Sequence, residues 1–173
     1  MFKILANKSY HWAKKIGNSY ISRILASKCP VEAFLYARDI DKKPHYLTRK
    51  GVLQDAYWSY DYAREIDKRP RDDTRKYASK EPNVAFDYAI DVDKSPHDLT
   101  RKSASEDAYY AYLYAIDVDK GPHDVTRNGA SKGPSFSLWY AKNVDEGPHE
   151  VTREGASKDP YYLEKYTKEV GLP

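Results

Sequence analysis

Apolar residues recur along this chain at the spacing of one face of an α-helix. In residues 108–119 they stand at positions i, i+3, i+4 and i+7, namely Ala111, Tyr114, Ala115 and Val118. The same stripe lies one period earlier, at Ala85, Tyr88, Ala89 and Val92. Because a strand would alternate with a period of two, the pattern predicts amphipathic helices with one buried face.

The stripe belongs to a repeat of 26 residues that runs through nearly the whole chain. A Thr-Arg pair returns at this interval without insertion or deletion, at Thr48-Arg49, Thr74-Arg75, Thr100-Arg101, Thr126-Arg127 and Thr152-Arg153. A tyrosine keeps the same interval at Tyr10, Tyr36, Tyr62, Tyr88, Tyr114, Tyr140 and Tyr166. A fixed short period of this kind is the signature of a tandem-repeat protein.

Two columns of proline divide each repeat into two helices. One column contains Pro44, Pro70, Pro96, Pro122 and Pro148, and the other contains Pro30, Pro82, Pro134 and Pro160. Proline suits the first turn of a helix and breaks its interior, so each column predicts a helix start. The second helix of a repeat, for example 122–132, is expected to bury Val125, Gly129 and Ala130. The small residue at the Gly129 position predicts that a neighbouring backbone passes close by.

These features predict an all-α solenoid of two-helix repeats, because helices this short are marginal alone and are stabilised by stacking on the next pair. We expect a single helical-repeat domain over 1–173, with about six repeats plus terminal caps and thirteen short helices. Residues 1–29 would form an N-terminal cap and a degenerate repeat. Residues 30–159 would form five regular repeats, and 160–173 a C-terminal capping helix.

Composition limits the compartment and the partners. The net charge is +3 with charged residues at 32%, which describes a surface of mixed sign without a general attraction to polyanions. Cys29 is the only cysteine, so no intramolecular disulfide can form, and a reducing compartment such as the cytoplasm is expected. No stretch of about 20 apolar residues occurs, so no membrane span is expected.

Basic residues concentrate at the start of the chain. The first 31 residues carry +6, whereas the remainder carries 23 basic and 26 acidic residues, or −3. Lys14 and Lys15 lie side by side in this basic segment. We expect the segment either to contact an acidic partner or surface, or to form a solvated cap.

The polar columns are interpreted as scaffold. A histidine recurs once per repeat at His45, His97, His123 and His149. Side chains one layer apart are too widely spaced to share a metal ion, so we expect helix-start residues near solvent. Asp39, Asp91 and Asp117 are expected to pair with arginines of the Thr-Arg column in an adjacent repeat. Without a phosphate loop, a metal-spaced Cys and His cluster or a nucleophile motif, we expect neither an enzyme nor a cofactor.

Function in a repeat protein is expected where the repeats differ, because identical columns are explained by stacking. Large aromatic residues vary at two positions beside the core stripe, and they include Trp58, Tyr60, Phe86, Tyr110, Tyr112 and Phe136. These side chains either pack between repeats or form a binding face rich in Tyr and Trp, residues that are common at interaction hot spots.

One repeat departs from the pattern within residues 69–77. Asp73 occupies a slot that is filled elsewhere by Ile21, Leu47, Leu99, Val125 and Val151. In the same repeat Arg71 replaces the histidine, and Tyr77 replaces a small residue. An ionised carboxylate in an apolar slot is costly unless it is paired. Either Asp73 turns to solvent or pairs with Arg71 or Arg75, or this helix pair forms the centre of a partner site.

Two short helices per repeat, each introduced by proline, with Ala-rich apolar faces, resemble the leucine-rich repeat variant family of short helical repeats. Here Tyr and Ala replace much of the Leu. The phrase "YAYLYAIDVDKGP" at 110–122 also resembles Tyr/Ala-rich helical repeats of uncharacterised proteins from tailed phages and large viruses. The resemblance covers residues 30–170 and implies no catalytic residues.

These features favour a noncatalytic scaffold that binds a protein partner through one face of the solenoid. The resemblance implies a phage or viral accessory protein that acts on a host or viral protein, in the host cytoplasm. A second candidate is a nucleic-acid-binding repeat, because helical repeats can read one base each and Tyr can stack on bases. Matched acidic and basic columns leave no basic stripe, which disfavours it. A third candidate is a structural component of a virion or larger assembly.

Overall fold

The computed structural model describes Tyr10 and residues 19–172, which divide into two compact units. Unit 1 is Met1–Lys80 and unit 2 is Glu81–Pro173. The described residues form twelve α-helices and no strand. The predicted all-α, solenoid-type helical repeat is therefore confirmed, while the single domain over 1–173 stays a prediction.

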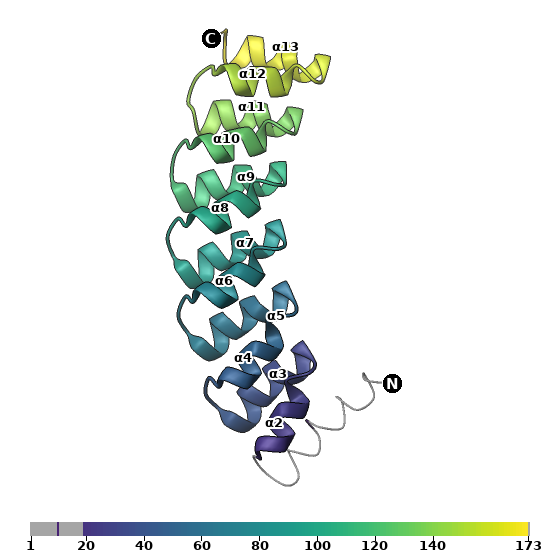
Figure 1. The fold of residues 1–173 in the computed structure, drawn as a ribbon. Coiled ribbons are helices and arrows are strands. Elements are labelled where there is room, and N and C mark those ends of the chain that lie inside the picture. Colours follow the sequence, from purple (N-terminus) through teal and green to yellow (C-terminus); the bar gives the residue numbers. More distant parts are fainter. Residues whose placement is uncertain (1–9, 11–18, 173) are drawn as a thin grey trace. The chain divides into compact units, whose positions relative to one another are not determined.

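Unit 1 consists of short helices joined by tight loops (Figure 1). They are α2 (Tyr20–Ala26), α3 (Pro30–Tyr36), η1 (Ala37–Asp41), α4 (Tyr46–Val52), α5 (Ala56–Asp61), η2 (Tyr62–Asp67) and α6 (Asp72–Ala78). The elements named η are π-helical turns that continue the preceding α-helix. Of the predicted N-terminal cap and degenerate repeat over 1–29, the structure describes Tyr10 and residues 19–29, which include α2.

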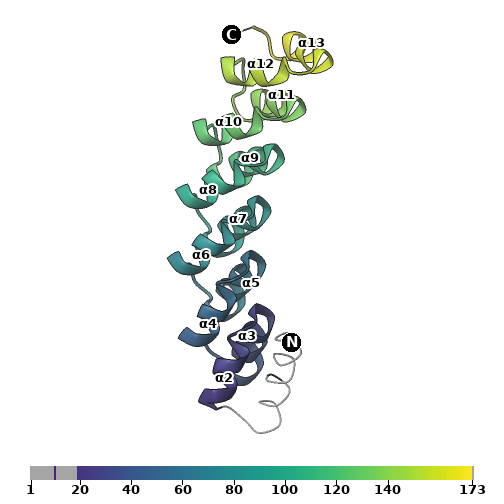
Figure 2. The same ribbon diagram turned by 45° about the vertical axis from the view of Figure 1, so that its right-hand side comes forward.

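Unit 2 continues the same alternation (Figure 1). Its elements are α7 (Pro82–Tyr88), η3 (Ala89–Asp93), α8 (Asp98–Ala104), α9 (Ala108–Tyr114), η4 (Ala115–Asp119), α10 (Asp124–Ala130), α11 (Pro134–Asn143), α12 (Glu150–Ala156) and α13 (Pro160–Glu169). Within the unit, α7 packs on α8, α9 on α10 and α11 on α12. Figure 2 shows these pairs lying in successive layers.

The predicted core stripe is confirmed. Ala111, Tyr114, Ala115 and Val118 are buried, and so are Ala85, Tyr88, Ala89 and Val92. The six tyrosines from Tyr36 to Tyr166 are completely buried, and Tyr10 nearly so. Of the second helix, Gly129 and Ala130 are buried as predicted, but Val125 is 39% exposed. That expectation was wrong because Val125 lies in the first turn of α10, on the side away from the core.

The hydroxyl groups of four buried tyrosines, Tyr62, Tyr114, Tyr140 and Tyr166, bind the first turn of the preceding helix. The Tyr114 Oη lies 2.9 Å from Thr100 Oγ1 and accepts a hydrogen bond from the His97 backbone N–H at 3.1 Å. Thr100 Oγ1 in turn donates to the His97 carbonyl at 3.0 Å. The same arrangement joins Tyr62, Thr48 and His45, Tyr140, Thr126 and His123, and Tyr166, Thr152 and His149. The Thr and Tyr columns are therefore parts of one interior network.

The histidine column supplies the N-caps of α4, α8, α10 and α12, which confirms its predicted place at helix starts. In each case the Nδ1 atom accepts a hydrogen bond from the backbone N–H two residues later, for example from Leu47 to His45 at 3.1 Å. Proline stands at the first helical position in α3, α7, α11 and α13, as predicted. In the other column it precedes the N-cap, so those helices begin two residues after the proline.

The arginines of the repeat form an ion-pair ladder, but with different carboxylates from those predicted. Arg101 donates from Nε and Nη2 to Asp119, 18 residues later, at 2.9 to 3.1 Å. Equivalent pairs join Arg23 with Asp41, Arg49 with Asp67 and Arg127 with Asp145. The expected partners were wrong by two residues: Asp117 is exposed, and Asp39 binds Arg38 and accepts a hydrogen bond from Tyr10.

Four repeats contain an α-to-π transition, a feature that the sequence pattern did not predict. After η1, η2, η3 and η4 the chain turns at a lysine in the left-handed conformation, with φ between 52° and 58° at Lys42, Lys68, Lys94 and Lys120. Glu146 takes the same conformation in the last repeat. A non-glycine residue pays roughly 1–2 kcal/mol there, and a lysine beside a helix C-terminus recovers part of that cost through the helix dipole.

Acidification is expected to destabilise the fold through the His45 N-cap. Burial lowers the pKa of His45, and the nearby charge of Arg23 lowers it further. The folded state therefore holds neutral His45 more firmly than the unfolded chain, whose histidine pKa is about 6.5. This stability is complete above about pH 6.5 and is lost as the pH falls through the folded-state value.

Urea unfolding at pH 7.5 and pH 5 measures the effect. His45→Asn keeps a good N-cap that does not titrate in this range, so the variant should lose less stability than the parent between the two pH values. An equal loss in parent and variant would show that His45 does not contribute to the pH dependence.

Candidate partner-binding surface

Six aromatic side chains of unit 2 form one continuous group, which we call the aromatic surface. Its members come from α7, α9 and α11 and are Phe86, Tyr109, Tyr110, Tyr112, Phe136 and Trp139. Between α7 and α9, the ring centroids of Phe86 and Tyr110 lie 6.1 Å apart, and within α9 those of Tyr109 and Tyr110 lie 5.1 Å apart. Between α9 and α11, the distances are 5.7 Å for Tyr109 and Phe136, 6.4 Å for Tyr112 and Phe136, and 6.0 Å for Tyr112 and Trp139. Within α11, Phe136 and Trp139 lie 5.2 Å apart. Tilted and edge-on contacts at these distances are favourable aromatic geometries.

The starts of α9 and α11 set the positions of these rings. Asp107 caps α9 by accepting from the backbone N–H groups of Tyr109 and Tyr110 at 2.9 and 3.2 Å, which fixes both rings in the first turn. On α11, Phe136 and Trp139 stand at i and i+3, so they share one side of the helix. The aromatic surface is thus built on rigid helical positions.

The aromatic surface is only partly covered. Tyr109 is 45% exposed and Trp139 is 43% exposed, while the other four rings are half-buried. At its edge the Asn143 side-chain amide donates to the Tyr112 hydroxyl at 2.9 Å. Close by in the chain, Lys142 pairs with Glu169 at 2.7 Å. An exposed aromatic centre with polar groups beside it is the composition of many protein interfaces.

Sequence reasoning identified four of the six rings, Phe86, Tyr110, Tyr112 and Phe136, and the structure brings these four together. It missed Tyr109 and Trp139, which are the most exposed members. A signal for them existed, because both lie on the outward side of their helices, away from the buried Tyr114 and Tyr140. Neither residue stands in the two repeat columns beside the core stripe that contain the other four rings.

The predicted aromatic residues of unit 1 pack against other residues of that unit. Trp58 lies with its ring centroid 5.3 Å from that of Phe34, at the edge of a buried cluster. Tyr60 is buried, and Arg64 stacks over its ring at 4.7 Å and donates to its hydroxyl at 2.7 Å. Their proposed role in partner binding stays a prediction.

The slot of Asp73 is not an apolar core position, so that premise was wrong. Leu99 in the same slot is 39% exposed, because this second helical residue faces solvent. Asp73 pairs with Arg71 at 3.3 Å and accepts from the Thr74 backbone N–H at 2.9 Å. Tyr77 is half-buried, with the Lys80 Nζ 4.1 Å from its ring centroid. A carboxylate therefore costs little here, and the departure does not by itself indicate a site.

Lys14 and Lys15, predicted to contact an acidic partner, lie outside the described residues.

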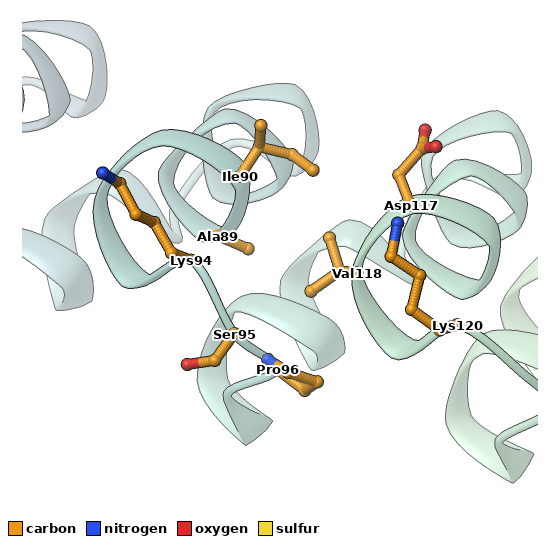
Figure 3. Close-up of a pocket in the computed structure, with 8 residues that line it drawn as sticks. All are labelled: Ala89, Ile90, Lys94, Ser95, Pro96, Asp117, Val118 and Lys120. Atoms are coloured by element: carbon orange, nitrogen blue, oxygen red, sulfur yellow. The ribbon is translucent and has the colours of Figure 1, made fainter.

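Unit 2 also contains a hollow of about 360 Å³ between the turns η3 and η4 (Figure 3). It is lined by Ala89, Ile90, Lys94, Ser95, Pro96, Asp117, Val118 and Lys120. Figure 3 shows Ile90 and Val118 facing one another across it, while Lys94 points away. Half of its lining is apolar, from Ala89, Ile90, Pro96 and Val118, and half is polar or charged.

Within the part of the chain that the structure describes, no three His, Cys, Asp or Glu side chains are placed to hold a metal ion. None of the described helices combines the length and apolar composition needed to cross a membrane.

The described chain thus belongs to the class of all-α helical-repeat proteins, with an aromatic surface as its candidate site. No family model, curated protein or solved structure matches it.

Proposed function

We propose that the protein is a noncatalytic repeat scaffold that binds a partner protein through the aromatic surface of unit 2. The observation that carries the proposal is the contiguity of six rings across three helices, with Tyr109 and Trp139 substantially exposed. These positions vary between repeats, so the stacking of the repeats does not require large aromatic residues there. Scattered exposed aromatics are ordinary, whereas a contiguous group on rigid elements marks an interaction surface.

The aromatic surface combines a large contact area with a small loss of conformational entropy on binding. Tyr and Trp side chains bury a large surface and lose few rotatable bonds, and here their mutual contacts already hold the rings in place. Binding of a partner therefore restricts these side chains little further. The adjacent apolar side chains of Ile90 and Val118 could extend the contact into the hollow.

Charge disfavours nucleic acid as the ligand of this surface. Unit 2 contains 11 basic and 17 acidic residues, or −6, and a polyanion is repelled by such a field. The stacking rings thus belong to the unit with an excess of acidic residues, whereas 18 of the 29 basic residues belong to unit 1. The sequence resemblance alone supports a phage or viral accessory role, with a host or viral protein as the partner or a larger assembly as the setting.

Truncating the two most exposed rings is expected to abolish most partner binding. A partner captured from cells of the natural source would be purified and titrated against parent and Tyr109→Ala/Trp139→Ala proteins. Because hot-spot aromatics contribute 2 kcal/mol or more each, we expect about a hundred-fold loss of affinity or greater.

Tyr57→Ala serves as the control, because Tyr57 is equally exposed but lies on α5 of unit 1. Its affinity should stay within about two-fold of the parent. Equal binding by the double variant and the parent would disprove the role of the aromatic surface, and capture of a nucleic acid instead of a protein would favour the second candidate.

A further inference from the structure

The two units carry opposite net charges, a feature that the proposed function leaves unused. Unit 1 contains 18 basic and 9 acidic residues, or +9, and unit 2 contains 11 basic and 17 acidic residues, or −6. The total of +3 hides this division. Opposed charges of this size on two parts of one chain attract other copies of the same chain.

In unit 1 the exposed positive charge gathers in two loops. Lys42 and Lys43 follow η1, Lys68 and Arg69 follow η2, and all four side chains are exposed. We call these four residues the basic ridge. The two turns η1 and η2 are in contact, so the loops that follow them are neighbours.

The acidic residues beside the basic ridge are already neutralised. Asp41 and Asp67 end η1 and η2, and only 1% of each side chain is exposed. They are paired with Arg23 and Arg49, so their charge is directed into the fold and away from solvent. In addition, α4 begins with Tyr46 where the later repeats have an acid. After Lys68 and Arg69, α6 begins with the acids Asp72 and Asp73, but each has its own arginine partner, Arg75 at 2.6 Å and Arg71 at 3.3 Å. The positive charge of the four ridge side chains therefore stays in excess.

In unit 2 the exposed negative charge gathers at α10 and α12. Asp124 and Glu150 are the first residues of these helices, Glu146 replaces the lysine of the preceding loop, and Glu154 lies one turn after Glu150. We call these four exposed residues the acidic patch. Helices α10 and α12 are in contact, so the patch spans two neighbouring repeats as the ridge does. Arg127 pairs with Asp124 at 2.6 Å, but the Asp124 side chain stays 89% exposed, unlike Asp41 and Asp67 beside the ridge.

We propose that the protein self-associates head to tail, with the basic ridge of one copy on the acidic patch of a second copy. The two surfaces are opposite in sign and equal in number of charges, and each extends over two successive repeats. A contact between two different surfaces leaves one of each free on every pair. Unless the rotation closes a ring, such a contact extends into an open chain of copies.

The association is weak and depends on salt. Each exposed ion pair contributes about 0–1 kcal/mol, and charges separated by more than about 8 Å are screened at physiological ionic strength. Sedimentation velocity of the full chain at about 200 µM should show a mass that rises with concentration in 20 mM NaCl and falls to that of the monomer in 300 mM NaCl. A monomer under both conditions would overturn the proposal.

Charge reversal identifies the surfaces. The ridge variant is Lys42→Glu/Lys43→Glu/Lys68→Glu/Arg69→Glu, and the patch variant is Asp124→Lys/Glu146→Lys/Glu150→Lys/Glu154→Lys. Each variant alone presents two surfaces of like charge and should be monomeric in 20 mM NaCl. An equimolar mixture restores opposite charges at both contacts, so it should associate as the parent does. Mixtures that remain monomeric, or single variants that associate like the parent, would overturn the proposal.

The substitutions in the ridge variant are compatible with the fold. Glu146 already occupies the left-handed position of Lys42 and Lys68, so glutamate is compatible with the ridge loops. Lysine at the first residue of α10 and α12 opposes the helix dipole. A neutral patch variant, Asp124→Asn/Glu146→Gln/Glu150→Gln/Glu154→Gln, avoids this cost and should also be monomeric. Circular dichroism confirms the helical content of each variant before its mass is measured.

Discussion

Replacing Gly129 by alanine is expected to lower the free energy of unfolding by about 2 kcal/mol. A Cβ atom at this position would lie 2.7 Å from the Ala111 Cβ and 2.7 Å from the Ser105 carbonyl oxygen. Both distances are below van der Waals contact, and the second neighbour is backbone that cannot turn aside. Alanine favours a helix interior by about 1 kcal/mol over glycine, but overpacking a tight interior costs about 1–3 kcal/mol, and a backbone clash lies at the upper end.

Gly121→Ala provides the matched control, because no atom lies within 4 Å of the corresponding Cβ. Its unfolding free energy should stay within about 0.5 kcal/mol of the parent. Urea denaturation with circular dichroism measures both variants. A Gly129→Ala protein as stable as the parent would mean that α10 can move away from α9 without loss.

Gly129 also illustrates what the sequence could predict. A small residue recurring at one position of a helix, against its own propensity, indicates close approach, and the structure confirms it at Gly51, Gly129 and Gly155. The buried tyrosine column was equally predictable, because a helical stripe repeated every 26 residues has one arrangement that buries every copy. These features follow from spacing along one helix, which the sequence contains directly.

The sequence predicts less well whether a side chain faces a neighbouring helix or the solvent. The apolar slot of Val125 and Leu99 was predicted to belong to the core, yet both residues are 39% exposed. Asp73 in that slot therefore needs no special explanation beyond its pair with Arg71. A single apolar column cannot show whether it faces inward, because a surface helix tolerates exposed Leu and Val.

The candidate site shows the same division. Variation between repeats led to Phe86, Tyr110, Tyr112 and Phe136, which do meet in unit 2. The same variation could not show that Trp58 and Tyr60 pack against other residues of unit 1. Their packing depends on the side chains that surround them in the folded chain. Position in a repeat is read from sequence, whereas exposure depends on the sizes of the surrounding side chains.

Three of the four ladder pairs use the last residue of a π-helical turn, namely Asp41, Asp67 and Asp119, whereas Asp145 follows the α-helix α11. The π-helical turn is a backbone feature that carries no composition signal. The Lys94 N–H donates to the Ala89 carbonyl five residues earlier, which defines the wider π-helical turn. In an α-helix continued to the end of residues 108–119, Asp117 and Asp119 would point in directions different from those observed. The π-turn η4 instead places Asp119 against Arg101 and leaves Asp117 exposed.

Asp119→Ala is therefore expected to destabilise the fold by about 2–3 kcal/mol. Asp119 is 6% exposed and Arg101 is 11% exposed, and two guanidinium nitrogens donate to the carboxylate. Breaking a buried pair costs about 3–5 kcal/mol because the remaining charge loses its partner. The loss should fall below that range, since Arg101 keeps its bond to Asp98 at 2.7 Å.

Asp117→Ala tests the pairing that the repeat pattern predicted. In that pairing Asp117, two residues before Asp119, binds an arginine of the Thr-Arg column. Asp117 is exposed at the edge of the hollow, so its removal should change the unfolding free energy by no more than about 0.5 kcal/mol. Guanidinium chloride, which screens charge, would blur the comparison, so both variants are measured by urea unfolding at low salt. If Asp117→Ala lost more stability than Asp119→Ala, the α-helical register would be correct and the π-turn would not form in solution.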